Sequence, residues 1–308
     1  MSVTSFKKAS RAAKYLRILV EGPSGSGKTY GALLMAYGML KLLGEGEIFV
    51  LDTEKGSSNS YTNIIDREYY VGDISAPYHP EALQQKLQEA VDAGAKVVIV
   101  DSITHFWEGS GGCLEINETL AKSKFRGNTY AAWSETKKIW RRMIEFINAL
   151  PCHVILTGRS KTETAQVNEG GRSTVKRLGM KLQAGENLEY EMDLAFSIVH
   201  DQHLATCIKD RTALFVDKIP SAITPEFGER LVQWLNSADQ PSPPPELVKH
   251  VRTEPSVYET AKAFLLNGAT PDQVNSSETK VLAYKSDGTL TDYQADELLA
   301  IIKEKQEK

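Results

Sequence analysis

The sequence has no long hydrophobic run and little cysteine. No stretch of its 308 residues approaches the ~18 consecutive apolar residues that a membrane-spanning helix requires, so no membrane association is expected. The three cysteines, Cys113, Cys152 and Cys207, are an odd number without C-x-x-C spacing, which argues against a disulfide framework and against a zinc ribbon. A reducing cytoplasm is therefore the expected compartment.

The chain also lacks a strong net charge of one sign. Lys and Arg number 36 against 40 Asp and Glu, so the net charge of −4 gives no global reason to bind nucleic acid. Basic residues nevertheless gather in two segments, 121–142 and 159–183. The first 17 residues hold five Lys or Arg and no acid, but they lack the apolar segment of a secretory signal. They predict a basic arm over 1–16 or, alternatively, a transit peptide.

Short β-branched runs alternate with helical patterns from residue 16 to about residue 210. This alternation is typical of an α/β fold with a mainly parallel sheet covered by helices. The runs predict strands at Leu16–Glu21, Ile48–Asp52, Val97–Asp101, His153–Thr157, Asp193–Val199 and Leu204–Lys209. The helical patterns predict helices at Lys28–Leu43, Pro80–Ala93, Tyr130–Ala149 and Pro225–Asn236.

A proline-rich stretch at 237–245 predicts an extended linker that divides the chain. The core would then span 17–236, and residues 246–308 would form a small helical module. Its predicted helices lie around Tyr258–Asn267, Asp272–Tyr284 and Asp292–Lys305. No internal repeat is visible.

Residues 22–29 match the phosphate-loop pattern G-x-x-x-x-G-K-[ST] at every fixed position. Its glycines let backbone N–H groups point at phosphate oxygens, and the helix that follows adds its positive N-terminal dipole. The pattern predicts that ATP binds here, with Lys28 at the β- and γ-phosphates and Thr29 as a ligand of Mg²⁺. The predicted nucleotide-binding residues are Gly22, Pro23, Ser24, Gly25, Ser26, Gly27, Lys28, Thr29 and Tyr30.

Two further predicted strands end in acids. Asp101 ends the strand Val97–Asp101 and is expected to hold Mg²⁺ through water, opposite Thr29. Asp52 and Glu54 follow the strand Ile48–Asp52. A carboxylate at such an edge can orient a water and take its proton, so Glu54 is the candidate base and Asp52 is read as structural.

The order phosphate loop, strand-Asp-Thr-Glu, then Val-Val-Ile-Val-Asp-Ser resembles the RecA-like ATPases. The resemblance implies that the strand starting at His153 lies between the phosphate-loop strand and the strand that ends at Asp101. It also implies that Thr157 or Arg159 senses the γ-phosphate. It also implies that Lys209 and Arg211 reach the nucleotide of a neighbouring subunit.

Further segments, including His105-Phe106-Trp107-Glu108-Gly109 and Ala131-Ala132-Trp133, resemble phage-encoded RecA-like ATPases of single-strand annealing and recombination, over about residues 14–236. This resemblance implies a homo-oligomer, ring or filament, with ATP at subunit interfaces. The implied partners are single-stranded DNA and a single-strand DNA-binding protein.

In that family two loops face the DNA, and Trp107–Tyr130 and Ser160–Tyr190 correspond to them here. We expect both segments to be long, irregular loops. Because they coincide with the basic segments and carry aromatic residues, they predict a salt-sensitive surface for single strands. The candidate contacts are Lys122, Lys124, Phe125, Arg126, Tyr130, Lys161, Arg172, Lys176 and Arg177. Trp133 and Trp140, seven residues apart, are instead expected in the core.

The predicted function is ATP hydrolysis, stimulated by single-stranded DNA, in recombination, annealing or repair. Two alternatives remain: a hexameric helicase or loader, and an ATP-switched regulatory scaffold that binds no DNA. A metal site at His200, His203 and Cys207 is less favoured than a hairpin joining the last two strands.

Overall fold

The computed structural model describes residues 11, 14–169, 172–215, 218–237, 257–267, 271–286, 289 and 292–306. Most of the predicted N-terminal arm, residues 1–10 and 12–13, lies outside this range, and so do residues 238–245 of the predicted linker. The chain divides into two compact units, Met1–Pro244 and Pro245–Lys308.

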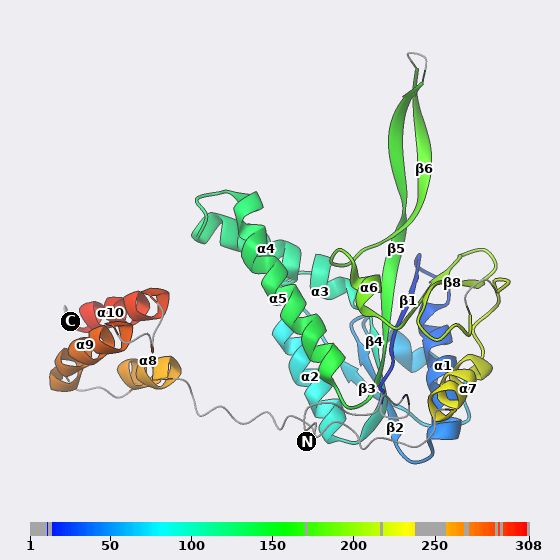
Figure 1. The fold of residues 1–308 in the computed structure, drawn as a ribbon, viewed down its shortest axis with the longest axis horizontal. Helices are drawn as coiled ribbons and strands as arrows, with labels where there is room; N and C mark the ends of the chain where they lie inside the picture. Colours follow the sequence, from blue (N-terminus) through cyan, green and yellow to red (C-terminus); the bar gives the residue numbers. More distant parts are fainter. Residues whose placement is uncertain are drawn as a thin grey trace, which may run out of the picture. The chain divides into compact units, whose positions relative to one another are not determined.

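A single sheet organises the first unit (Figure 1). Among the described residues it contains β1 (Arg17–Gly22), β2 (Glu47–Asp52), β3 (Tyr70–Asp73), β4 (Ala95–Asp101), β5 (His153–Glu169), β6 (Arg172–Leu182), β7 (Leu194–Ile198) and β8 (Ala205–Asp210). The order is β3-β2-β4-β5-β1-β7-β8, and β6 pairs with β5. All pairings are parallel except β5–β6 and β7–β8. Strand β5 lies between β1 and β4, so the predicted RecA-like α/β fold is confirmed.

Helices cover both faces of the sheet. On one face α1 (Lys28–Leu43) packs with α7 (Pro225–Asn236), and on the other α2 (Pro80–Asp92) packs with α5 (Thr129–Ala149). Successive side chains of a strand point to opposite faces. In β1, Ile18 and Val20 therefore join the α1–α7 cluster, whereas Leu19 joins the other. Burial on both faces explains the continuous apolar runs by which the strands were predicted.

Strands β5 and β6 continue past the sheet as a two-stranded antiparallel arm (Figure 1). The prediction of an irregular loop over Ser160–Tyr190 is wrong here, and only the end of that segment carries a short helix, α6 (Leu188–Glu191). The sequence of this segment shows no regular alternation of apolar and polar residues, the pattern by which a half-buried strand is predicted. Cross-strand hydrogen bonds define the arm instead.

The segment Trp107–Tyr130 is also not an irregular loop. It contains the end of α3 (Thr104–Glu108), all of α4 (Cys113–Ser123) and the start of α5. The buried positions of α4 are Cys113, Asn117 and Ala121, which give a weak hydrophobic pattern because one is polar and one is small. Asn117 is accommodated because its side-chain oxygen accepts a hydrogen bond from the Thr136 hydroxyl at 3.0 Å.

The second unit consists, in its described part, of α8 (Val257–Asn267), α9 (Pro271–Ser286) and α10 (Asp292–Gln306), and these three helices confirm the predicted ones. They share a small core formed by Leu265, Val274, Val281, Ala295, Leu298 and Ile302. Across the described residues of both units, no helix combines the length and the apolar character needed to cross a membrane.

Candidate nucleotide site

The phosphate loop joins β1 to α1 at the carboxyl edge of the sheet. Gly25 and Gly27 have φ angles of 76° and 92°, in the left-handed region that favours glycine, and Gly27 directly precedes α1. The Lys28 ammonium donates a hydrogen bond back to the Pro23 carbonyl oxygen at 2.8 Å. Ser26 is fully buried, and its hydroxyl has no hydrogen-bond partner among the described residues. The loop is therefore a cradle with polar groups still to be satisfied by a ligand.

Asp101 joins the loop to the neighbouring strands. One carboxylate oxygen accepts a hydrogen bond from the Thr29 hydroxyl at 2.7 Å, and the other accepts one from the Thr157 hydroxyl. Burial raises the pKa of Asp101, while both hydrogen bonds oppose the rise. Hydroxyl and carboxylate oxygens side by side are the donors that Mg²⁺ prefers, and phosphates and waters usually complete its octahedral shell. The residues present therefore fit this ion.

Glu54 and Arg159 form an ion pair beside the loop. The Arg159 Nε donates to one Glu54 carboxylate oxygen at 3.0 Å, and its Nη2 donates to the other. Asp52, only 1% exposed, holds the preceding turn by accepting hydrogen bonds from the backbone N–H groups of Glu54 and Ser58. Asp52 thus fixes where Glu54 stands.

The structure adds His105, which sequence reasoning did not include in the site. Its Nδ1 lies 2.6 Å from the Thr53 hydroxyl oxygen, and its ring stacks on Tyr78 with centroids 5.0 Å apart. Burial lowers the pKa of His105, although the Glu54 carboxylate opposes this. Its position four residues after Asp101 was the available signal, but a lone histidine on a short helix predicts no role by itself.

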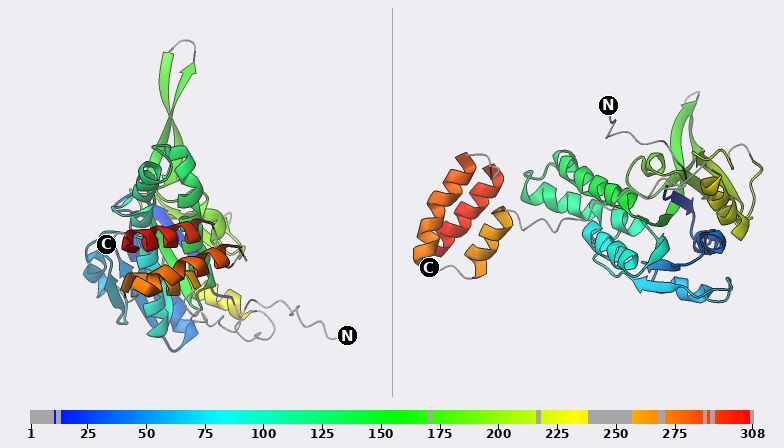
Figure 2. Two further views of the ribbon diagram at one scale, coloured as in Figure 1. Left: turned by 90° about the vertical axis from the view of Figure 1, so that its left-hand side faces the viewer. Right: turned by 60° about the horizontal axis from the view of Figure 1, so that its bottom comes forward.

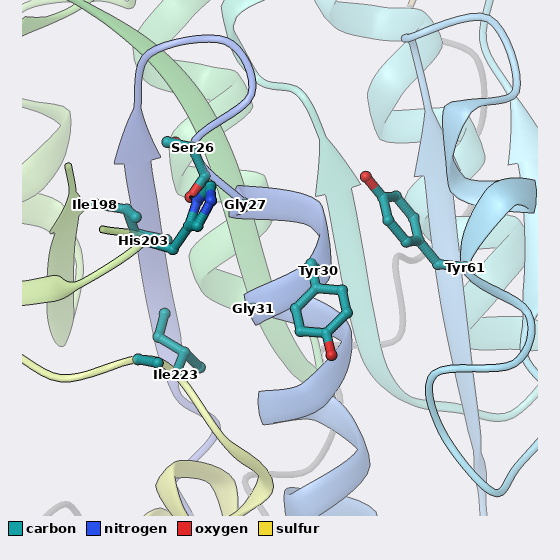
Figure 3. Close-up of a pocket in the computed structure, with 9 residues that line it drawn as sticks. Ser26, Gly27, Tyr30, Gly31, Tyr61, Ile198, His203 and Ile223 are labelled. Carbon is teal, nitrogen blue, oxygen red and sulfur yellow. Dashed lines mark hydrogen bonds between the residues drawn. The ribbon is translucent and has the colours of Figure 1, made fainter. Parts of the chain in front are cut away.

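A cavity of about 360 Å³ opens beside the loop. Ser26, Gly27, Tyr30, Tyr61 and Ile223 contribute to its lining, as do Gly31, Ile198, His203 and Ala222 (Figure 3). The Tyr30 and Tyr61 rings meet edge to face at 6.2 Å. An apolar, aromatic cavity that adjoins a phosphate cradle can take the sugar and base of a nucleotide. Of the residues that line it, the sequence predicted Ser26, Gly27 and Tyr30 alone.

The profile of the AAA domain family matches residues 14–222, about two thirds of the chain. The chain belongs to this family. With the phosphate-loop geometry, this identifies the first unit as a P-loop ATPase domain of RecA-like fold. No curated protein matches the sequence. One similar solved structure is the KaiC-like protein PH0186 from the hyperthermophilic archaeon Pyrococcus horikoshii OT3, with 15% identity, 68% of this chain and 86% of that chain covered, and a TM-score of 0.41.

Lys209 and Arg211 lie far from the phosphate loop of their own AAA domain. Asp210, which lies between them in the sequence, pairs with Leu194, and Leu194 pairs with Ile18 near the start of β1. The phosphate loop follows the other end of β1, so the two cations and the loop lie at opposite ends of the strands. The Lys209 Nζ donates to the carbonyl oxygens of Glu189, at 2.9 Å, and Tyr190. Arg211 donates to the Tyr190 oxygen at 3.1 Å. These two cations therefore take no part in the site of their own chain.

The predicted DNA contacts occupy two projections of the AAA domain. Lys122, Lys124, Phe125, Arg126 and Tyr130 lie at the α4–α5 connection, where Tyr130 is 87% exposed. Lys161 lies at the base of the arm and is exposed, and Arg172, Lys176 and Arg177 belong to β6, with side chains outside the described part. Trp133 and Trp140 both pack with Trp107, at 5.7 and 5.0 Å between ring centroids. Trp140 is buried in the core as expected, whereas Trp133 is only half-buried and the expectation for it is wrong.

The described residues contain no group of three or more His, Cys, Asp and Glu side chains placed to hold a metal ion. His200 and His203 instead belong to the turn between the antiparallel strands β7 and β8, as the hairpin interpretation predicted.

Proposed function

We propose that the protein hydrolyses Mg·ATP in a homo-oligomer, and that single-stranded DNA bound by its two projections stimulates hydrolysis during recombination or annealing. The main observation in support is that β5 runs without a break from the nucleotide site into the arm. Arg159, which binds Glu54 at the nucleotide site, and Lys161, at the base of the arm, lie two residues apart on this strand. A ligand on the arm therefore acts on the same strand that carries Arg159, the ion-pair partner of the predicted base Glu54.

The chain's own residues supply a complete set of roles for in-line attack of water on the γ-phosphate. Lys28 leaves the Pro23 oxygen and neutralises phosphate charge. Thr29 and Asp101 would hold Mg²⁺, which supplies further neutralisation of the phosphate oxygens. Glu54 orients the water and accepts its proton, and Thr157 and Arg159 respond to the γ-phosphate.

The ion pair between Arg159 and Glu54 bears on the timing of the reaction. While the guanidinium engages both carboxylate oxygens, it competes with the attacking water for Glu54. An arginine that turns to the γ-phosphate would release Glu54 when ATP is present. Binding of DNA to the arm would favour the same movement through β5, which accounts for the proposed stimulation.

The position of Lys209 and Arg211 supports a site completed between subunits. They lie at the sheet edge opposite the loop, so they can reach a nucleotide held by another subunit. Cationic groups supplied to the transferring phosphoryl group in this way accelerate hydrolysis by about 10³–10⁵ in other phosphate-loop enzymes. Hydrolysis would then depend on assembly.

The two projections support a surface for single strands. Residues 161–182 carry five Lys or Arg against two Glu. At the α4–α5 connection, Tyr130 offers an exposed ring to stack on a base, and the Lys124 ammonium lies 5.7 Å from the Phe125 ring. Figures 1 and 2 show both projections beyond the same edge of the sheet. With this role we also propose a cytoplasmic location and a single-strand DNA-binding protein as a further partner.

The decisive experiment compares ATP turnover with and without single-stranded DNA. Wild type should be stimulated, and the stimulation should fall steeply with added salt because released counterions drive binding. The variant K176A/R177A should keep basal turnover and lose stimulation. The matched control K280A/K303A, which removes two exposed lysines from the second unit, should behave as wild type. Glu54→Gln should bind ATP but abolish turnover in both conditions.

Turnover that DNA leaves unchanged, together with a salt-independent affinity, would reject the DNA role and favour an ATP-switched scaffold. Unwinding of a duplex by the protein alone would instead favour a helicase or loader. Full turnover by Glu54→Gln would reject the assigned base while leaving DNA binding open.

A further inference from the structure

The turn between β7 and β8 contacts the outer side of the phosphate loop. His203 Nδ1 lies 3.0 Å from the Ser26 carbonyl oxygen. A Cβ atom built on Gly25 would stand 3.3 Å from His200 Nε2, so this second imidazole also approaches the loop. His203 has a φ of 54°, a left-handed conformation that is uncommon without glycine. Strained backbone of this kind concentrates at ligand-binding sites, where the surrounding structure holds it.

The contact with Ser26 fixes the tautomer of His203. A carbonyl oxygen only accepts hydrogen bonds, so Nδ1 must carry the proton. In the neutral ring Nε2 is then an acceptor, and it points away from Ser26 because the two nitrogens lie on opposite sides of the imidazole. No described residue donates a hydrogen bond to this nitrogen.

The unpaired acceptor belongs to a side chain that lines the nucleotide cavity. His203 stands at its loop end beside Ser26 and Gly27, whereas the Tyr30 and Tyr61 rings stand farther from the loop (Figure 3). A nucleotide whose phosphates occupy the loop places its ribose directly after them and its base beyond. The ribose therefore lies nearest to His203.

We propose that His203 is a nucleotide-binding residue whose Nε2 accepts a hydrogen bond from a ribose hydroxyl, while its Nδ1–H holds the phosphate loop. A neutral acceptor selects the ribose over the α-phosphate, because phosphate oxygens have no proton to donate. The inference rests on the proposed nucleotide site and adds a residue that recognises the ribose hydroxyls; 2′-deoxyADP shows whether the 2′- or the 3′-hydroxyl is the donor.

Calorimetric binding of ADP, 2′-deoxyADP and 2′,3′-dideoxyADP to the full chain at pH 8 tests this inference. Wild type should bind ADP roughly three- to tenfold more tightly than the dideoxy form, the effect of one neutral hydrogen bond. His203→Asn should remove this preference. Asparagine suits a left-handed backbone and its amide can still donate to Ser26, so the loop contact survives.

His200→Asn is the matched control in the same turn and should keep the preference of wild type. Equal affinities of wild type for the three nucleotides would overturn the proposal. A preference that survives in His203→Asn, or that disappears equally in His200→Asn, would overturn it too. Lys28→Ala tests the site itself: if that variant binds ADP as wild type does, the proposed nucleotide site fails, whatever the ribose preference.

Discussion

Glu21 is a buried carboxyl directly ahead of the phosphate loop, and its replacement by glutamine should change how stability depends on pH. The residue is 5% exposed and pairs with Gly158 of β5 and Ser197 of β7. Burial raises the pKa of Glu21 from 4.5 to about 7, and the Glu189 carboxylate adds to the rise, while a hydrogen bond with Ser197 opposes it. Glu21 is therefore largely protonated in the fold at pH values where it is ionised in the unfolded chain.

The direction of the effect follows from proton linkage. Because its pKa is higher in the folded state, Glu21 contributes stability below pH 4.5, and this contribution is lost as the pH rises through about 7. A pKa change of this size corresponds to about 3 kcal/mol. We expect ~2 kcal/mol in practice, since the effective dielectric of real protein interiors reduces such contributions. Glu21→Gln has no proton to lose at this position. Its free energy of unfolding relative to that of wild type should therefore rise by ~2 kcal/mol between pH 5 and pH 8.

Urea unfolding followed by tryptophan fluorescence measures this difference in the full chain. All four tryptophans, Trp107, Trp133, Trp140 and Trp234, lie in the first unit, so the signal reports on the ATPase domain alone. Glu118→Gln on the exposed face of α4 is the control and should differ from wild type by a constant amount. If the free-energy difference between Glu21→Gln and wild type stays flat from pH 5 to pH 8, the reasoning from burial is wrong.

Two further predictions concern the site and the assembly. Thr157→Val removes a hydroxyl that donates to the buried Asp101 carboxylate, so the free energy of unfolding in urea should fall by about 2 kcal/mol. Thr157→Ser should recover most of this loss. An unchanged midpoint of urea unfolding in Thr157→Val would contradict the prediction. K209A/R211A should lower turnover on the order of 10³-fold without weakening ATP binding. Mixing it with Lys28→Ala subunits should restore part of the turnover, and mixtures no more active than either variant alone would argue against a site shared between subunits.

The sequence by itself determined the phosphate loop and the core strands of this protein. The phosphate loop is local, because eight consecutive residues carry both the backbone freedom and the lysine that phosphate binding needs. Strands β1, β2 and β4 were predictable because helices bury both of their faces, which requires uninterrupted apolar runs. Since parallel strands end at one edge, Glu54, Asp101 and Thr157 could be expected near the loop before any contact was known.

Only the tertiary structure decided which of these groups touch. Glu54 and Arg159 are 105 positions apart, and Asp101 meets Thr29 and Thr157 across 72 and 56 positions. Such pairs depend on strand order and register, which no local pattern encodes.

The same reason accounts for the elements that the sequence mispredicted. The arm is defined by pairing between its own two strands, and α4 buries a polar Asn117, so neither segment shows a clear hydrophobic period in the sequence. His203 reaches the loop because β7 lies beside β1, which brings the turn after β7 next to the turn after β1.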